Sequence, residues 1–247
     1  ANALVHETMV SEGDHVISIC PTYQQHYSIP ESYGAEVEIL WLKPENNFLP
    51  DLIELKSMLR SNTKLIVLNN PNNPTGALMM DEYLNNFIDV IAPSGAYVLC
   101  DEVYRGTNQE GTGFAPAMAD IYDKGISVSS MSKVFSLAGI RLGWIAGPRE
   151  VLESVMIRRD YNTISVGMID DYFASLALEN KEKIIERSQN ITRGNLKILD
   201  EWVSNEPSIT YIKPKSGTTA LLRYDLEMTS RDLCIQLLQN TGVMFTP

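Results

Sequence analysis

Short apolar segments that alternate with longer helical patterns constrain the fold of this chain more than any other feature. Each short segment holds β-branched and aliphatic residues in succession, without the polar alternation of a strand that faces water on one side. The short segments cover residues 15–20, 36–42, 64–69, 96–100, 126–129 and 143–146. Between them lie helix-length segments such as residues 49–60 and 81–91. This order predicts an α/β fold, with a mostly parallel sheet sandwiched by helices and right-handed crossover connections.

The pattern changes after about residue 170. Residues 171–205 form one charge-rich helical stretch, with an interruption expected near Asn190. The elements predicted after it are two short strands and a helix, at residues 208–212, 219–223 and 230–240. We therefore predict a large domain over residues 1–187 and part of a small α+β domain over residues 188–247. Because the chain opens without Met inside a helical pattern, we expect it to be a piece of a longer protein.

Composition and charge argue against several classes of protein. Apolar residues make up 44% of the chain and charged residues 21%, as in proteins that fold around a buried core. Lys and Arg number 20 against 31 Asp and Glu, and the net charge of −11 argues against a nucleic-acid or membrane partner. No apolar segment reaches the roughly 20 residues of a bilayer span. Three widely spaced cysteines favour a cytoplasmic location and give no metal-ligand spacing, so no metal site is expected.

Polar side chains follow three of the predicted strands. Asn73, Asp101 and Lys133 each come shortly after a different apolar segment. Taken singly, they have ordinary explanations as a turn residue, a helix cap or salt-bridge partner, and a surface lysine. In an open parallel sheet, however, ligands bind outside the carboxyl ends of the strands. The three residues would then converge on one crevice, which favours a binding site that contains an amide, a carboxylate and an amine.

The segments around these residues resemble the class I/II aminotransferases, which are fold-type I enzymes that depend on pyridoxal phosphate. The matching motifs are PNNPTG at residues 71–76, DEVY at 101–104, and SMSK at 130–133 followed by GIRLGW at 139–144. The resemblance implies the large domain of that fold type, with a mostly parallel sheet of the seven-stranded type, and part of its small C-terminal domain. It also implies a homodimer with active sites at the subunit interface.

The resemblance gives a role to each residue around the cofactor's ring. Lys133 would bind the aldehyde of the cofactor as an imine and later move the proton at the substrate carbon. Asp101 would keep the pyridine nitrogen protonated, because a nearby carboxylate favours the cationic form. Asn73 and Tyr104 match the positions that donate to the phenolate oxygen. Tyr23 matches the aromatic residue that stacks on the ring.

The resemblance also implies a site for the cofactor's phosphate. Ser130 would donate its hydroxyl, and Arg141 would make two parallel hydrogen bonds. Ala1 and Asn2 match the first turn of the family's phosphate-binding helix, whose free N–H groups attract anions. Gly217 resembles a loop that lines the substrate pocket, although an ordinary turn fits it equally well.

The implied reaction is a ping-pong transamination between an amino acid and a 2-oxo acid. The same residues would serve a carbon–sulfur lyase or a cyclase that uses pyridoxal phosphate, because the cofactor carries the chemistry. A regulatory module that binds the cofactor is a further alternative, and the acidic charge counts against it. No residue matches the arginine that holds the substrate carboxylate in this family, so the substrate is left open. His6, His15 and His26 are expected to be structural.

Overall fold

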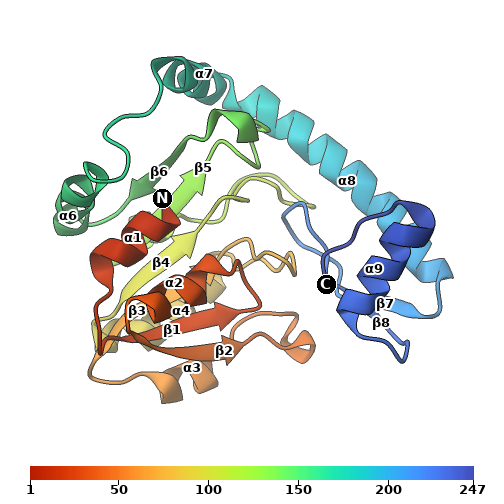
Figure 1. Cartoon of the computed structure of the whole chain (residues 1–247), viewed down its shortest axis with the longest axis horizontal. Helices are drawn as coiled ribbons and strands as arrows, with labels where there is room; N and C mark the ends of the chain where they lie inside the picture. Colours follow the sequence, from red (N-terminus) through yellow and green to blue (C-terminus); the bar gives the residue numbers. More distant parts are fainter.

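All 247 residues are described by the computed structural model, whose six-stranded sheet is covered by helices on both faces (Figure 1). The strands are β1 (His15–Cys20), β2 (Glu36–Trp41), β3 (Thr63–Asn69), β4 (Tyr97–Asp101), β5 (Gly125–Ser130) and β6 (Gly143–Ala146). The helices that cover them are α1 (Asn2–Met9), α2 (Gln25–Ser32), α3 (Leu52–Met58), α4 (Asp81–Ile91), α5 (Met118–Ile121) and α6 (Arg149–Arg159). Each apolar segment identified in the sequence forms one strand, which confirms the predicted α/β fold.

The strands lie side by side in the order β2-β1-β3-β4-β5-β6. Strands β1 to β5 run parallel, and β6 pairs antiparallel with β5. The mostly parallel sheet is confirmed, with six strands in this chain where the fold type has seven. Because β2 lies on one side of β1 and β3 on the other, the direction of strand addition reverses between β1 and β3. In parallel sheets, ligands bind outside the carboxyl ends of the strands at such a reversal.

Two apolar clusters, one on each face of the sheet, fix the helices. Ile17 and Ile19 of β1 belong to the cluster with α3, α4 and α5, whereas Val16 belongs to the cluster with α1 and α6. Successive side chains of a strand point to opposite faces, so a strand covered on both sides requires an uninterrupted apolar run. Helix α4 spans the predicted residues and buries Leu84 and Phe87 in the first cluster.

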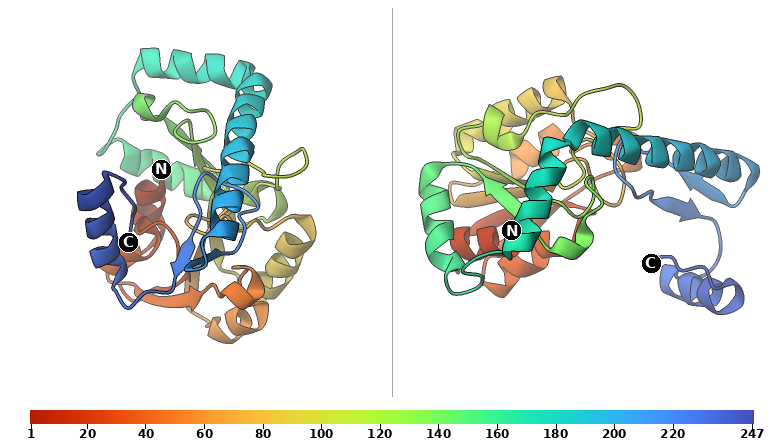
Figure 2. Two further views of the ribbon diagram at one scale, coloured as in Figure 1. Left: turned by 90° about the vertical axis from the view of Figure 1, so that its right-hand side faces the viewer. Right: turned by 90° about the horizontal axis from the view of Figure 1, so that it is seen from above.

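A smaller C-terminal unit follows two further helices and projects away from the sheet (Figure 2). It contains β7 (Ile209–Tyr211), β8 (Leu222–Tyr224) and α9 (Ser230–Thr241), and β7 and β8 pair antiparallel. The helices that lead to it are α7 (Met168–Glu179) and α8 (Lys181–Asn205). The interruption predicted near Asn190 is wrong, because the helical stretch is interrupted at Asn180 instead. The carboxamide of Asn180 donates to the carbonyl of Leu176 at the end of α7.

Helix α8 is continuous across residues 187 and 188, so the predicted domain boundary falls within it. That boundary stays a prediction. Although α8 has 25 residues, it is rich in charged side chains. No helix in the chain combines the length and the hydropathy needed to span a bilayer.

Candidate active site

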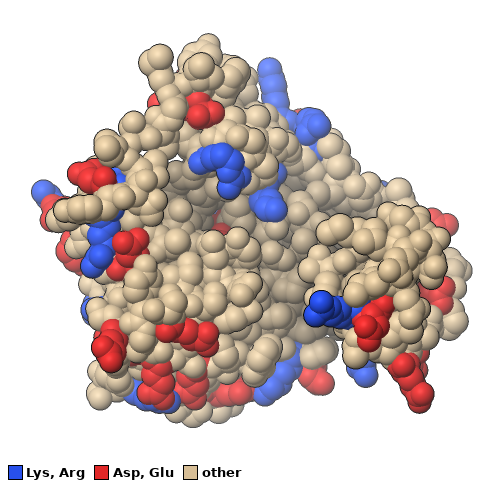
Figure 3. Space-filling view, viewed as in Figure 1, with Lys and Arg blue, Asp and Glu red and all other residues tan.

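A cavity of about 460 Å³ opens at the carboxyl ends of the parallel strands. Small-molecule sites typically have volumes of about 300–1,000 Å³. All nine residues predicted to contact a cofactor line it: Ala1, Asn2, Tyr23, Asn73, Asp101, Tyr104, Ser130, Lys133 and Arg141. Figure 3 shows a hollow on this face, with basic side chains near its edge and a small acidic area inside. The fold therefore brings residues from four strand ends and the start of α1 to one place.

Asp101 ends β4 and lies at the bottom of the site with 6% of its surface exposed. Its Oδ2 accepts a hydrogen bond of 2.7 Å from Asn2 Nδ2, and its Oδ1 accepts one of 3.0 Å from the Val103 N–H. Burial acts to raise the pKa of this carboxyl, but His26 and the hydrogen bonds from Asn2 and Val103 outweigh it. The pKa therefore lies below its ordinary value, and the carboxylate stays ionised at neutral pH.

Two fully buried histidines lie behind this carboxylate. His26 Nε2 is 3.5 Å from Asp101 Oδ2, and the ring centroids of His26 and His6 are 6.0 Å apart. None of the four ring nitrogens has a well-aligned hydrogen-bond partner. Burial and then the charge of His26 lower the pKa of His6 to about 3, so His6 is neutral near pH 7. The only local signal for this pair is the position of His26, three residues after Tyr23.

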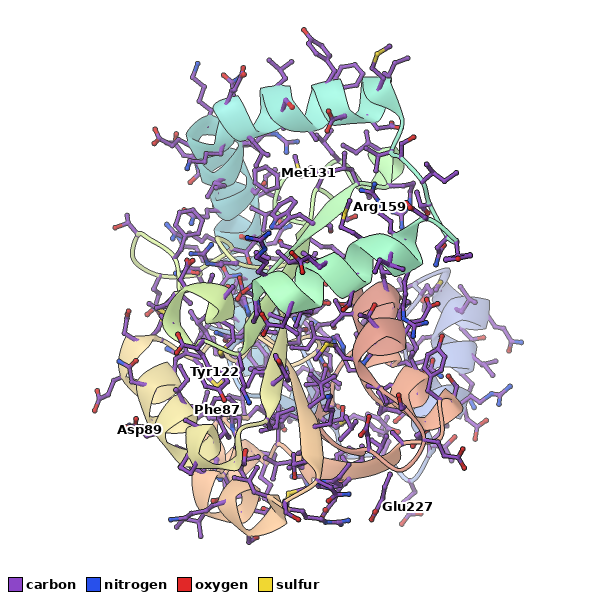
Figure 4. All side chains as sticks on the ribbon, turned by 90° about the vertical axis from the view of Figure 1, so that its left-hand side faces the viewer. Phe87, Asp89, Tyr122, Met131, Arg159 and Glu227 are labelled. Atoms are coloured by element: carbon purple, nitrogen blue, oxygen red, sulfur yellow. The ribbon has the colours of Figure 1, made fainter.

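Lys133 lies in the loop after β5, between two buried anchors. Met131 is fully buried and packs against α7, and Figure 4 places it beneath this helix. Val134 accepts a hydrogen bond of 2.8 Å at its carbonyl from the Ser188 hydroxyl of α8. The Lys133 side chain is exposed to the cavity, and its Nζ lies 5.8 Å from the centroid of the Tyr104 ring. The anchors fix the backbone while the amine stays free to react.

The rim of the cavity carries positive charge without protein partners. Neither Lys133 nor Arg141 forms an ion pair with a carboxylate of the chain, and Arg141 Nη1 donates only to the carbonyl of Ala138, at 2.7 Å. Arg141 also has a left-handed backbone, with φ of 51°, a conformation found in strained functional loops. Helix α1 begins at the same cavity, and helix N-termini attract anions. This rim suits a ligand that brings its own negative charge, such as a phosphate ester.

The site also contains residues that sequence reasoning missed. Asn69 and Gln25 line the cavity beside the predicted residues. The signal for Asn69 was present, because it is the last residue of the strand that leads to Asn73. Asn2, assigned to the phosphate from the family pattern, instead donates to Asp101 in this structure.

The loop around Gly217 does not line the cavity but is bound to the turns that do. The Gly217 N–H donates to Thr107 Oγ1 at 2.8 Å, and Thr107 Oγ1 donates to the carbonyl of Tyr104 at 2.6 Å. The carbonyl of Gly76 accepts from the N–H of Lys215 at 2.8 Å. Gly76 has φ of 70°, and a Cβ there would lie 2.4 Å from Pro214 Cβ, so no other residue fits this contact.

Two other hollows, of about 410 and 420 Å³, carry none of the predicted residues. A hollow of about 410 Å³ between α1 and α6 is lined by Glu7, Arg158 and Tyr161, among others. No group of three or more His, Cys, Asp and Glu side chains is arranged to hold a metal ion. The cavity at the strand ends is therefore the one that combines an amine, a carboxylate, hydroxyl groups and aromatic rings.

Comparisons of the sequence and of the structure with known proteins both find aminotransferases. The sequence profile of the family described as aminotransferase class I and II matches residues 1–247. A PLP-dependent aminotransferase from Streptococcus suis 89-1591 is 44% identical, with a TM-score of 0.95 over 100% of this chain and 65% of its own. Capreomycidine synthase from Streptomyces vinaceus is 30% identical over 95% of this chain, and an aspartate aminotransferase from Pyrococcus horikoshii is 30% identical over 87%. The chain spans 60% and 55% of the lengths of these two relatives.

Proposed function

Because the chain belongs to the class I and II aminotransferase family, we propose that it binds pyridoxal phosphate and transfers an amino group between an amino acid and a 2-oxo acid. One observation carries the proposal: an unpaired lysine and a buried carboxylate line the same cavity at the carboxyl ends of the strands. When bound, pyridoxal phosphate supplies an aldehyde for covalent attachment and a ring that accepts electrons from the substrate carbon.

Lys133 and Asp101 would carry the chemistry. Lys133 Nζ would bind the aldehyde carbon and, once displaced by the substrate's amino group, move the proton at the substrate's α-carbon. Asp101 would hold a proton at the ring nitrogen, and its low pKa suits this role because the carboxylate must stay negative. The hydrogen bonds from Asn2 and Val103 keep the carboxylate in a fixed orientation.

The remaining residues would hold and orient the cofactor. Asn73 and Tyr104 would donate to the phenolate oxygen, and Tyr23 would stack on the ring. Ser130, Arg141 and the first turn of α1, with Ala1 and the backbone N–H of Asn2, would bind the phosphate. The unpaired charge of Arg141 supports this placement.

We infer further that the protein is a cytoplasmic homodimer. Large apolar side chains are exposed along α7 and the segment before it, including Tyr161 at 91%, Met168 at 85% and Ile164 at 72%. Exposed large apolar side chains that lie close together along the chain are typical of interaction sites. Light scattering should give twice the 27.6 kDa of one chain, whereas a monomer would contradict the dimer.

A cyclase or carbon–sulfur lyase is the competing function, and one relative of the chain, capreomycidine synthase, is not named as an aminotransferase. Both functions would use the same cofactor residues. To separate them, we would add single amino acids to the cofactor-loaded protein without an oxo acid. Loss of the visible absorption with formation of the pyridoxamine form indicates half a transamination, whereas release of pyruvate and ammonia indicates a lyase. Absence of any cofactor absorption after addition of pyridoxal phosphate would contradict the whole proposal.

Replacement of Lys133 tests the catalytic assignment most directly. Lys133→Ala should abolish covalent attachment of the cofactor and lower turnover by about three orders of magnitude or more, because the nucleophile and the proton carrier are one group. The measurements are the visible spectrum and the rate with the amino acid identified above. Lys197→Ala, an exposed lysine of α8 without an ion pair, should leave both unchanged. A Lys133→Ala protein with normal turnover would rule out the assignment.

A further inference from the structure

We propose that Asn69 is a positioning residue that fixes Asn73 and Asp101 relative to each other. Asn73 would donate to the phenolate oxygen of the cofactor and Asp101 would face its ring nitrogen, so Asn69 would set the spacing between these two contacts. The effect on the cofactor rests on the proposed function, but the bridge that the Asn69 side chain forms between the two turns is a property of the chain alone. Asn69 is the last residue of β3, is 4% exposed, and forms part of the cavity wall.

The carboxamide of Asn69 contacts both neighbouring turns at once. Its Nδ2 donates to the carbonyl of Asp101 at 2.6 Å, and its Oδ1 accepts from the N–H of Asn73 at 2.7 Å. A carboxamide holds its donor and its acceptor in one rigid plane. Two short bonds from one plane therefore fix the distance between the two backbone groups more tightly than either bond alone.

The strand pairing explains why this position can form the bridge. Asn69 is the register partner of Asp101 in the parallel pair of β3 and β4. The Asp101 carbonyl also accepts from the Asn70 N–H at 3.0 Å, so both of its lone pairs are used. The backbone ladder between β3 and β4 ends at this pair. Beyond it, the Asn69 side chain provides the next hydrogen bond, to the turn that carries Asn73.

The residues closest to asparagine in size or chemistry do not reproduce both contacts. Leucine has the right volume but neither donor nor acceptor, and it would leave the buried N–H of Asn73 unpaired. Aspartate keeps the acceptor but loses the donor to the Asp101 carbonyl. The longer glutamine would have to displace the turn to fit in the same buried space.

The neighbouring Asn70 provides a matched control. It is also 4% exposed, and its carboxamide makes the same pair of contacts, donating to the carbonyl of Met79 at 3.0 Å and accepting from the N–H of Met79 at 2.9 Å. Met79 lies outside the cavity wall. Asn70→Ala therefore removes an equivalent pair of buried bonds without touching the link between Asn73 and Asp101.

The first test uses the chain without cofactor. Amide hydrogen exchange, followed by NMR, should show the Asn73 N–H exchanging about tenfold faster in Asn69→Ala than in the unchanged protein, since one buried hydrogen bond is lost. Asn70→Ala should leave that amide protected and expose the Met79 amide instead. Asn69→Ser, whose hydroxyl is too short to bridge both groups, is measured alongside and should behave like Asn69→Ala. Equal protection of the Asn73 amide in all proteins would overturn the proposal.

The second test uses the cofactor-loaded protein. In Asn69→Ala, the pH at which the visible absorption of the bound cofactor changes should shift by about one unit, a tenfold change in proton affinity. Asn70→Ala should leave this pH unchanged even where it lowers stability equally. An exchange effect without a spectral shift would overturn the positioning role. Failure of the unchanged protein to bind pyridoxal phosphate would instead overturn the proposed function, and hydrogen exchange alone would then decide on the bridge.

Discussion

The sheet and the C-terminal unit of this chain are held by different kinds of interaction. The sheet and its helices bury two apolar clusters, whereas neither β7, β8 nor α9 contains a buried residue. The buried part of the C-terminal unit is the loop around Ser216, which is held by hydrogen bonds that its N–H groups donate to the Gly76 carbonyl and to Thr107 Oγ1. The difference teaches that apolar packing builds the platform for the site, while a few polar contacts align the second unit with it.

The largest expected difference comes from the same substitution in the two regions. Leu84→Ala in α4 removes a side chain that is 1% exposed and should lower the free energy of unfolding by about 2–5 kcal/mol. Leu238→Ala in α9 changes a leucine that is 47% exposed and should cost less than about 1 kcal/mol. Urea unfolding followed by circular dichroism measures both. Equal losses would show that α9 is packed as tightly as α4, and the comparison would fail.

A smaller effect is expected where the two regions meet. The Thr107 hydroxyl donates to the carbonyl of Tyr104, accepts from the Gly217 N–H and lies 3.2 Å from Ser216 Oγ. Thr107→Val keeps the volume but leaves the buried Gly217 N–H unpaired, and should cost about 1–3 kcal/mol. Thr107→Ser retains the hydroxyl and should preserve most of the stability. The exchange rate of the Gly217 amide checks the cause, since it should rise in the valine variant alone.

The gentlest probe of the platform is its pH dependence. The pKa of His6 is about 3 in the folded chain and about 6.5 when the chain is unfolded. Below pH 6.5 His6 takes up a proton in the unfolded chain but not in the folded one. The contribution of His6 to stability is therefore fully present above that pH and is lost as the pH falls toward 3. The contribution is about 1.4 kcal/mol per pH unit.

Unfolding by urea between pH 7.5 and 4.5 measures this slope. His6→Gln cannot take up the proton, so below pH 6 its free energy of unfolding should fall less steeply with decreasing pH, by about 1.4 kcal/mol per unit. Above pH 7, the difference in stability between the two proteins should not change with pH. An unchanged acid slope in His6→Gln would mean that other groups cause it.

The elements that depend on local composition could be predicted from the sequence, and long-range polar contacts could not. The strand His15–Cys20 and the helix Asp81–Ile91 lie where apolar runs and acidic first turns placed them. Seven of the nine site residues converge because the carboxyl ends of parallel strands share one edge, and Ala1 and Asn2 join them from the start of α1. The bond from Asn2 to Asp101 had no local signal, because it depends on how α1 meets β4. The sequence predicted the helix break near Asn190, whereas the break lies at Asn180. Both residues are asparagines, and packing decides which of them ends a helix.

The separation of the site residues along the chain has a consequence for folding. The bond between Asn2 and Asp101 joins groups 99 residues apart, and that between Thr107 and Ser216 joins groups 109 apart. Contacts of such long range close large loops, and chains rich in them fold slowly. The strands must pair in their final order before the carboxyl edge exists. We therefore expect the cavity to be among the last parts of the molecule to assemble, so that a ligand that fits it would recognise only chains that have finished folding.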